Sequence, residues 1–403
     1  MDAELAGVQL WNGTESRGSS TLRWSAGSGL VTAVESAAEG TAAAELSVIP
    51  GLIDTHVHLI GYAGTGTPDF LGWPLVTRPE EQTLHGLAQA RSALAVGVTT
   101  VRDLSADDIQ FSLARALGQG IIEGPRVFAY GIVSMTGGHA DLFTPPAVTQ
   151  RRPTADGPDA SRALVRHWAR AGADGIKIAT SGGVLSVGDK SAWRNHTTAE
   201  IEAIIDEAHA LGMRVAAHAH TEDGIERALD AGVDSLEHAT LISRELAARA
   251  AAAGVTVAPT LLINEVIASG GAGVTVEQAA KGAELVLRRD ELLRQAANEG
   301  VDFVLGTDAN GRHVRFGEQL DELRRMSAVL GWSAERTLQA ATTRAAAAIG
   351  HPELGRLESG SPADFVVLRG RPWESLDSLR EENIVAVVVR GRVLVGSLPA
   401  AGS

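Results

Sequence analysis

The sequence predicts an α/β protein, a (β/α)8 TIM barrel beside a small β-sandwich domain built from both termini. Eight apolar, β-branched runs alternate with amphipathic helices through the middle of the chain, which is the pattern of buried parallel strands joined by crossover helices. Short alternating segments separated by turn residues precede and follow this region, which is typical of antiparallel strands. A doubly wound sheet gives the same strand–helix alternation and is the alternative fold.

Residues 1–48 read as small antiparallel strands with turns, for instance at 7–11 and 29–34. The eight barrel strands are then expected at 52–58, 98–103, 126–132, 175–180, 214–220, 235–239, 256–259 and 302–307. Helices with a 3.6-residue period are expected at 198–211, 224–231, 276–299, 318–330 and 334–349.

The C-terminal residues return to strand character, at 363–368 and 384–389. Neither terminal segment has enough strands to bury a face alone, so we expect the two segments to form one sandwich. The predicted domains are residues 1–48 (sandwich), 49–353 (barrel) and 354–403 (sandwich).

Composition excludes several functions. With 49 acidic and 35 basic residues the formal net charge is −14, whereas a nucleic-acid surface needs clustered Lys and Arg. Cysteine is absent, which excludes disulfide scaffolds, thiol nucleophiles and cysteine zinc sites. The first 15 residues lack the features of a signal peptide, and no apolar run reaches the roughly 18 residues of a membrane helix. We therefore expect a cytoplasmic protein without a membrane or nucleic-acid partner.

Two histidines end the first barrel strand. His56 and His58 are two residues apart, so both side chains point to the same face of a strand. At the C-terminal end of a barrel strand this face lines the site of barrel enzymes, and paired imidazoles bind divalent metals well. An isolated His-x-His pair is more often structural than a metal site.

Lys177 is flanked by Ile176 and Ile178 on a predicted core strand, where an unpaired lysine is rare. Burial lowers a lysine pKa and leaves a neutral amine. Such an amine can act as a base, form a Schiff base, or add CO₂ to give a carbamate that bridges two metals. The alternative is an ion-paired structural lysine.

Four further residues fall at predicted strand ends. His218 and His220 close the fifth strand, His238 closes the sixth, and Asp308 follows the eighth. Core packing alone does not require histidine or aspartate at the ends of several strands at once, so we predict a metal site. The remaining histidines other than His139 are expected to face solvent; they are His85, His167, His196, His209, His313 and His351.

The motifs together resemble the amidohydrolase superfamily, and in particular its imidazolonepropionase-like and prolidase-like branch, which includes Xaa-Pro dipeptidase and ochratoxin-hydrolase types. The resemblance covers nearly the whole chain, and its matching stretches are residues 50–59, 97–104, 177–184, 215–220, 231–238, 306–309 and 360–368.

The resemblance implies a binuclear site for divalent metals, usually Zn²⁺. His56, His58 and Asp308 match ligands of the more buried ion, and His218 and His238 match ligands of the second. Lys177 matches the lysine that CO₂ carboxylates to bridge the two. The sequence alone leaves open whether His218 or His220 is the ligand; the spacings suit the branch if it is His218, which leaves His220 as a substrate contact.

Two departures from the branch concern the substrate. Thr221 replaces the glycine that commonly follows the His-Ala-His motif, and residues 259–264 lack the tyrosine usual in dipeptidase-like relatives. The missing tyrosine puts a substrate with a free α-carboxylate in doubt.

The functional hypothesis is a binuclear metal-dependent hydrolase that cleaves an amide-type C–N bond, such as that of an N-acyl amino acid or dipeptide, by metal-bridged hydroxide. Asp308 would move the proton to the departing nitrogen, and His139 would donate to the oxyanion. A mononuclear deaminase or imidazolonepropionase-like cyclic-amide hydrolase is the alternative, and a non-catalytic binding protein is a second rival. Barrels of this branch commonly self-associate, so a homo-oligomer is expected.

Overall fold

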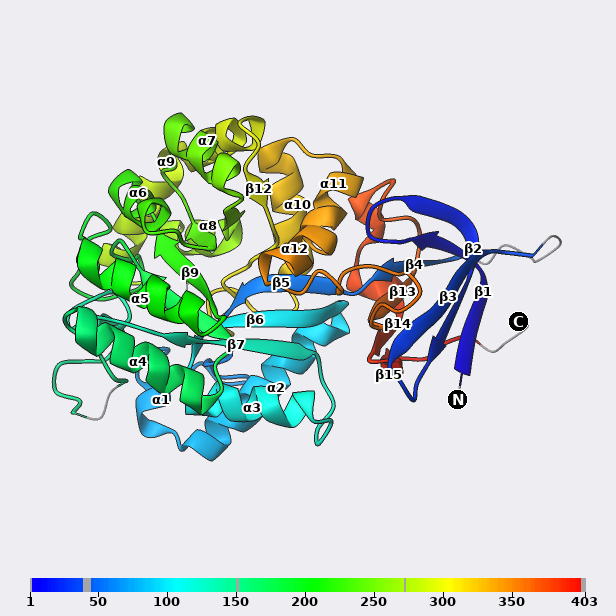
Figure 1. Cartoon of the computed structure of the whole chain (residues 1–403), viewed down its shortest axis with the longest axis horizontal. Helices are drawn as coiled ribbons and strands as arrows, with labels where there is room; N and C mark the ends of the chain where they lie inside the picture. The colour runs from blue at the N-terminus through cyan, green and yellow to red at the C-terminus, as the bar shows by residue number, and fades with distance from the viewer. Residues whose placement is uncertain (1, 39–44, 150–151, 272, 400–403) are drawn as a thin grey trace.

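The computed structural model describes residues 2–38, 45–149, 152–271 and 273–399. They form a curled parallel sheet surrounded by helices and, beside it, a second sheet to which both ends of the chain contribute (Figure 1). The predicted α/β class, with a parallel sheet and a separate terminal sheet, is confirmed.

The first sheet has eight parallel strands in sequence order. They are β5 (Leu52–Val57), β6 (Val98–Ala106), β7 (Arg126–Ile132), β8 (Gly175–Ala179), β9 (Arg214–Ala219), β10 (Ser235–His238), β11 (Thr256–Ala258) and β12 (Asp302–Phe303). The amide of Thr55 donates to the carbonyl of Leu305, and the amide of His58 donates to Ala309. The segment after β12 therefore returns to the first strand of the sheet.

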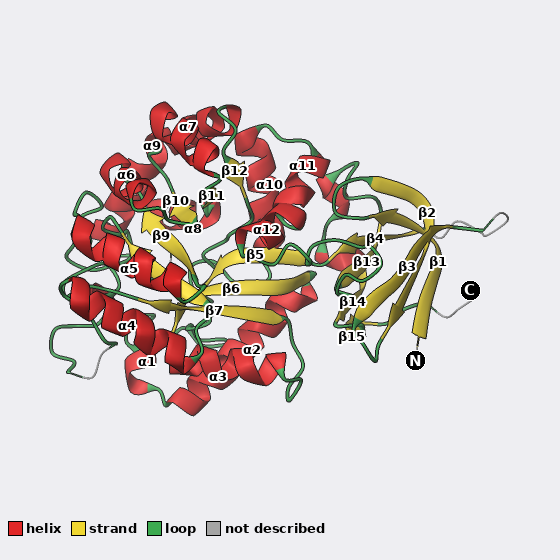
Figure 2. Cartoon of the chain, viewed as in Figure 1, coloured by secondary structure: helices red, strands yellow, loops and turns green. Residues whose placement is uncertain are grey.

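Helices surround this sheet (Figure 2). They are α1 (Trp73–Val76), α2 (Pro79–Ala95), α3 (Asp108–Gly118), α4 (Pro158–Ala171), α5 (Thr198–Ala210), α6 (Glu222–Asp230), α7 (Arg244–Ala253), α8 (Leu261–Ala268), α9 (Val276–Asn298), α10 (Gln319–Leu330), α11 (Ala334–Ala340) and α12 (Thr343–Ala348). Helices α1 and α8 lie at the cavity that opens at the carboxyl ends of the strands. Short 3₁₀ turns lie at Asp141–Phe143, Leu376–Ser378 and Glu381–Asn383. Capping boxes, in which Thr197 and Thr275 cap α5 and α9, explain why these two helices begin where the sequence predicts.

The second sheet contains β1 (Asp2–Trp11), β2 (Ser16–Ser25), β3 (Leu30–Ser36), β4 (Leu46–Pro50), β13 (Phe365–Arg369), β14 (Ile384–Val389) and β15 (Arg392–Gly396). Its order is β15-β14-β13-β4-β1-β2-β3, so β4 joins the N-terminal strands to the C-terminal ones. The expectation of purely antiparallel pairing is wrong at one place, because β1 and β4 are parallel. Only Gly51 separates β4 from β5, so the direction in which the chain enters the parallel sheet also fixes the direction of β4.

One predicted helix, 334–349, is broken into α11 and α12. The carbonyl of Ala340 accepts from the amide of Leu305, and that of Ala341 accepts from Ile53. These two carbonyls bond to the edges of the parallel sheet instead of to a following helical turn, which interrupts the helix. The same contacts explain why β12 is shorter than predicted, because the chain beyond Phe303 bonds to α11 and β5.

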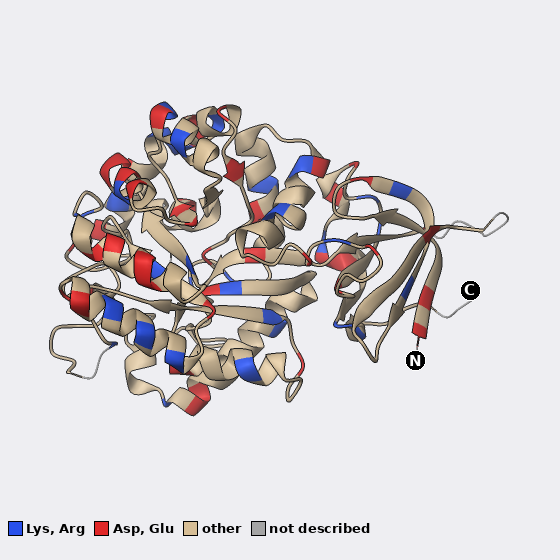
Figure 3. Ribbon diagram, in the orientation of Figure 1, with Lys and Arg blue, Asp and Glu red and all other residues tan. Residues whose placement is uncertain are grey.

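The main core lies between the helices and the parallel sheet, where Val98, Trp168, Ile176 and Ile204 are buried. Acidic and basic residues alternate along the outer helices (Figure 3). Within the described residues, no helix is both long and apolar enough to cross a membrane.

Candidate metal centre

A cavity of about 760 Å³ opens at the carboxyl ends of the parallel strands. All eight site residues proposed from the sequence line it; these are His56, His58, His139, Lys177, His218, His220, His238 and Asp308. They come from six different strands or strand-end loops that only the fold brings together.

The first cluster joins β5 to the segment after β12. The Nε2 atom of His58 lies 2.9 Å from Oδ1 of Asp308, and Nε2 of His56 lies 3.7 Å from the same oxygen. Burial opposes ionisation of Asp308, but His56, His58 and Lys177 outweigh it and lower the pKa of this carboxyl to about 2. Asp308 is therefore an anion that two imidazoles face.

The second cluster is a group of three histidines. Ring nitrogens of His218, His220 and His238 all lie within 4.8 Å of one another, and His238 also belongs to a group with His56 and Asp308. The hydroxyl of Thr260 lies 2.6 Å from Nδ1 of His238, which leaves Nε2 to face the cavity. The structure thus places both His218 and His220 within ligand distance of His238.

Three residues at this edge adopt backbone angles that non-glycine residues avoid. The φ angles are 70° at His238, 57° at Asp308 and 47° at Thr260. Left-handed backbone at non-glycine positions is costly and concentrates at functional sites. At His238 and Asp308 it turns the side chains over the end of the sheet.

Lys177 is buried on β8, and its Nζ atom has no hydrogen-bond partner in the described part of the chain. Burial lowers the pKa of this amine to about 8, which increases the fraction of the neutral form that reacts with CO₂, although the amine is still mostly protonated at pH 7. No ion pair joins it to a described residue, contrary to the alternative of an ion-paired structural lysine.

The donors fit a divalent metal. Imidazole nitrogens and a carboxylate oxygen converge on one cavity, and these are the ligands that zinc and similar ions take. The unpartnered Nζ of Lys177 is a polar atom whose burial costs free energy unless a ligand or modification completes it.

A buried ion pair that the sequence did not predict lies behind His56. Glu237 lies 2.8 Å from Nδ1 of His56 through Oε2 and 2.7 Å from Arg102 through Oε1. The Ser235 hydroxyl donates to the same carboxylate. Arg102 is 1% exposed and lies outside the cavity wall. The sequence offered one signal for this pair, because Arg102 and Glu237 have opposite charges and each lies on an otherwise apolar strand.

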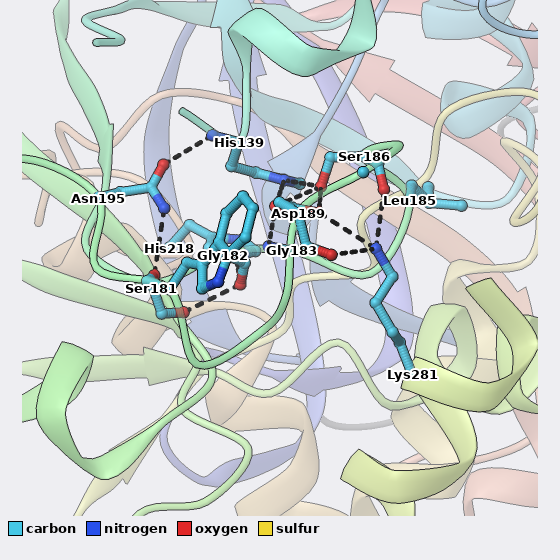
Figure 4. Close-up of polar contacts among 12 residues, drawn as sticks. His139, Ser181, Gly182, Gly183, Leu185, Ser186, Asp189, Asn195, His218 and Lys281 are labelled. Atoms are coloured by element: carbon cyan, nitrogen blue, oxygen red, sulfur yellow. Dashed lines mark hydrogen bonds and ion pairs between the residues drawn. The ribbon is translucent and has the colours of Figure 1, made fainter. Parts of the chain in front are cut away.

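His139 lies against His218, with ring centroids 4.4 Å apart, and a polar network holds it from behind (Figure 4). Its Nδ1 lies 2.8 Å from the Ser186 hydroxyl, which lies 2.8 Å from each carboxylate oxygen of Asp189. Lys281 of α9 pairs with Asp189 at 3.1 Å. Since Asp189 can only accept, Ser186 donates to it and must accept from Nδ1–H of His139. Neutral His139 therefore presents an unprotonated Nε2.

Two histidines were expected to face solvent and do not. His196 is 1% exposed and His313 is 8% exposed. His196 follows the loop after β8 and lines the cavity wall, and His313 packs edge-on against Phe70. Tertiary packing of long loops, which local sequence does not reveal, buries both.

A model of the amidohydrolase family matches residues 47–394. Ochratoxinase from Aspergillus niger is 31% identical over 366 residues, which are 85% of this chain and 74% of that protein. Its crystal structure aligns with a TM-score of 0.85 and 27% identity, covering 100% of this chain and 96% of the other. A crystal structure of a Xaa-Pro dipeptidase with bound methionine in the active site aligns with a TM-score of 0.87 and 28% identity, covering 98% and 100%.

Proposed function

Because the chain belongs to the amidohydrolase family, we propose that it is a binuclear metal-dependent hydrolase in which a carboxylated Lys177 bridges the two ions. It is a hydrolase of amide-type C–N bonds, as are the relatives that match it over most of their length. The observation that carries the binuclear proposal is Lys177 itself, a buried amine with no hydrogen-bond partner among the described residues, in a cavity of imidazoles and a carboxylate.

In this proposal the parallel sheet is a closed (β/α)8 barrel, and the ligands divide as the family resemblance implies. His56, His58 and Asp308 hold one ion, and His218 and His238 hold the other. Two divalent cations repel each other strongly in a buried site, and an anionic carbamate on Lys177 offsets that repulsion. The bound ions would lower the pKa of water and polarise the scissile carbonyl.

Asp308 is the proposed proton carrier. It is ionised, it is held by His58 at 2.9 Å, and its strand-end position faces the cavity. It can take the proton of the attacking water and deliver it to the departing nitrogen, which must leave as a neutral amine.

We propose a different role for His139 from the predicted donation to the oxyanion. The hydrogen bond between Nδ1 and the Ser186 hydroxyl favours a neutral ring whose Nε2 is an acceptor. Burial lowers the pKa of His139 to about 4, which keeps the ring neutral near pH 7. We therefore propose that His139 accepts a hydrogen bond from a substrate N–H or O–H group.

His220 is the proposed substrate contact. Its Nδ1 lies 2.8 Å from the Thr240 hydroxyl, and its backbone amide donates to Ser181. These contacts fix the ring with Nε2 toward the cavity. The proposed substrate is a small amide, either an N-acyl amino acid or dipeptide or a related amide that lacks the free α-carboxylate.

The test is a hydrolysis screen on protein reconstituted with Zn²⁺, with metal per chain measured on the same samples. Two ions per chain and turnover of N-acyl amino acids or dipeptides support the proposal. One tight ion with activity that does not depend on CO₂ would instead support a mononuclear deaminase or cyclic-amide hydrolase. A metal-loaded protein inert toward amides, peptides, carbamates and ureas would refute the hydrolase mechanism.

A further inference from the structure

A second cavity, of about 360 Å³, lies beside the metal-site cavity. The loop after β5, helix α2 and the loop that follows Asp308 surround it, and Phe70 lines both cavities. The function proposed above does not use it.

Two arginines line this second cavity. Within the described ranges the guanidinium groups of Arg312 and Arg315 have no ion pair or hydrogen bond, and only the backbone amides of these residues donate, to Asn310 and Glu318. The cavity wall includes one carboxylate, Asp69, which accepts from the backbone amide of Gly72. The wall therefore carries a net positive charge in a chain whose net charge is −14, which favours an anionic ligand.

Gln89 of α2 offers a second, independent observation. It is 3% exposed, it lines the cavity, and neither its Nε2 nor its Oε1 atom has a hydrogen-bond partner in the described part of the chain. A Cβ atom added at Gly61 would lie 3.0 Å from Nε2 of Gln89, and one added at Gly311 would lie 2.2 Å from it. The two glycines therefore make room for this amide. A buried amide without partners is costly, and a polar ligand would satisfy it.

Three aromatic side chains contribute to the wall. Tyr62 and Trp73 meet edge to face with ring centroids 5.7 Å apart, and both line the cavity together with Phe70. Such a wall suits a flat apolar body, while guanidinium groups suit a carboxylate.

We propose that this cavity is an accessory binding site for a small aromatic carboxylate. The carboxylate pairs with Arg312 and Arg315, the Gln89 amide donates to it, and the ring packs against Tyr62 and Trp73. The site is separate from the metal centre and does not depend on the reaction there. Its ligand has the chemistry of the acid that amide hydrolysis releases.

The test uses benzoate as the probe and calorimetry as the readout, on the full chain freed of metal by chelation and also carrying Lys177→Ala. Removing the metal centre in this way makes the result independent of the proposed function. We expect benzoate to bind, and benzamide, which has the same shape without the charge, to bind at least tenfold more weakly.

Arg312→Gln and Arg315→Gln are expected to raise the benzoate Kd at least tenfold each, and Gln89→Leu to raise it severalfold. Arg170→Gln, an exposed arginine on α4, is the matched control and should leave the Kd unchanged. Circular dichroism checks that each variant is folded. Benzoate binding that requires bound metal, or that the two cavity arginines do not affect, would overturn the proposal.

Discussion

The Oε2 atom of Glu237 lies 2.8 Å from Nδ1 of His56, while Oε1 of the same carboxylate lies 2.7 Å from Arg102. All three side chains are at most 1% exposed. Arg102 also lies over the ring of Tyr130, 5.2 Å from its centroid. A buried carboxylate behind a histidine fixes the orientation of the ring and strengthens it as a metal ligand. Glu237 and Arg102 are therefore positioning residues for the proposed metal centre.

Glu237→Gln should weaken metal binding about 10- to 100-fold, because the neutral amide no longer orients His56 as an anion does. It should also destabilise the protein by roughly 3–5 kcal/mol, since Arg102 stays buried without its anion. Metal competition with a chelator and urea unfolding measure the two effects. Adding Arg102→Met should recover stability but not metal affinity, and Glu226→Gln on the surface of α6 is the control. Wild-type metal affinity in Glu237→Gln would show that the contact is structural only.

Lys177→Ala should lose most of its bound metal and about two orders of magnitude or more of activity, while the fold remains, because the proposed role of Lys177 is electrostatic. Short carboxylic acids that occupy the vacated bridging position should restore part of the activity. Metal per chain and hydrolysis rate, with and without added acetate or propionate, check this. Lys190→Ala, which changes an exposed lysine in the loop after β8, should behave as wild type. Two ions and near-native turnover without added acid would refute the bridging assignment.

Features set by local pattern could be predicted from the sequence. Strand β14 has the expected bounds, 384–389, and α9 ends one residue before its predicted end, because apolar runs and caps are local signals. The position of the candidate site residues in one cavity could also be predicted, because parallel strands present their carboxyl ends at one edge of a sheet; their role as metal ligands stays a prediction. His56, Lys177 and Asp308 needed only the strand order to be placed in one cavity.

Features that depend on distant partners could not be predicted. Glu237 and Arg102 are 135 residues apart in sequence, and Lys281 and Asp189 are 92 apart. The tautomer of His139 follows from a chain of hydrogen bonds that no motif encodes. The break between α11 and α12 depends on carbonyls that the parallel sheet uses.

Ser186→Ala should release the ring of His139, because Nδ1–H loses its acceptor and both neutral tautomers become populated. We expect kcat to fall roughly 10- to 100-fold, the cost of one lost or misdirected hydrogen bond, while metal content stays unchanged. Nitrogen NMR shifts of His139 measure the tautomer directly, which a purely structural role of Ser186 would not alter. Ser269→Ala, at the exposed end of α8, is the control. An unchanged tautomer in Ser186→Ala would contradict the assignment.

Glu322 offers a test of the pH dependence of stability away from the metal centre. It is buried, and its carboxyl accepts from the amides of Leu261 and Leu262 at 2.7 and 2.9 Å, at the start of α8. Burial nevertheless raises the pKa of this carboxyl from 4.5 to about 8. The folded state therefore holds a proton that the unfolded state releases between these two values, so the free energy of unfolding falls as pH rises through this window.

Glu322→Gln cannot ionise, so its free energy of unfolding should fall less between pH 5 and pH 8 than that of the wild type. The difference should be on the order of 1–4 kcal/mol, since each unit of pKa difference is worth about 1.4 kcal/mol. The glutamine has one acceptor oxygen for the two amides of Leu261 and Leu262, so the variant is expected to be less stable than the wild type at pH 5. At this pH residue 322 is uncharged in the folded state of both proteins. Urea unfolding of metal-free protein at both pH values measures this, with Glu284→Gln on α9 as an exposed control. Parallel pH profiles for wild type and Glu322→Gln would mean that Glu322 is ionised in the folded state and that its two hydrogen bonds outweigh its burial.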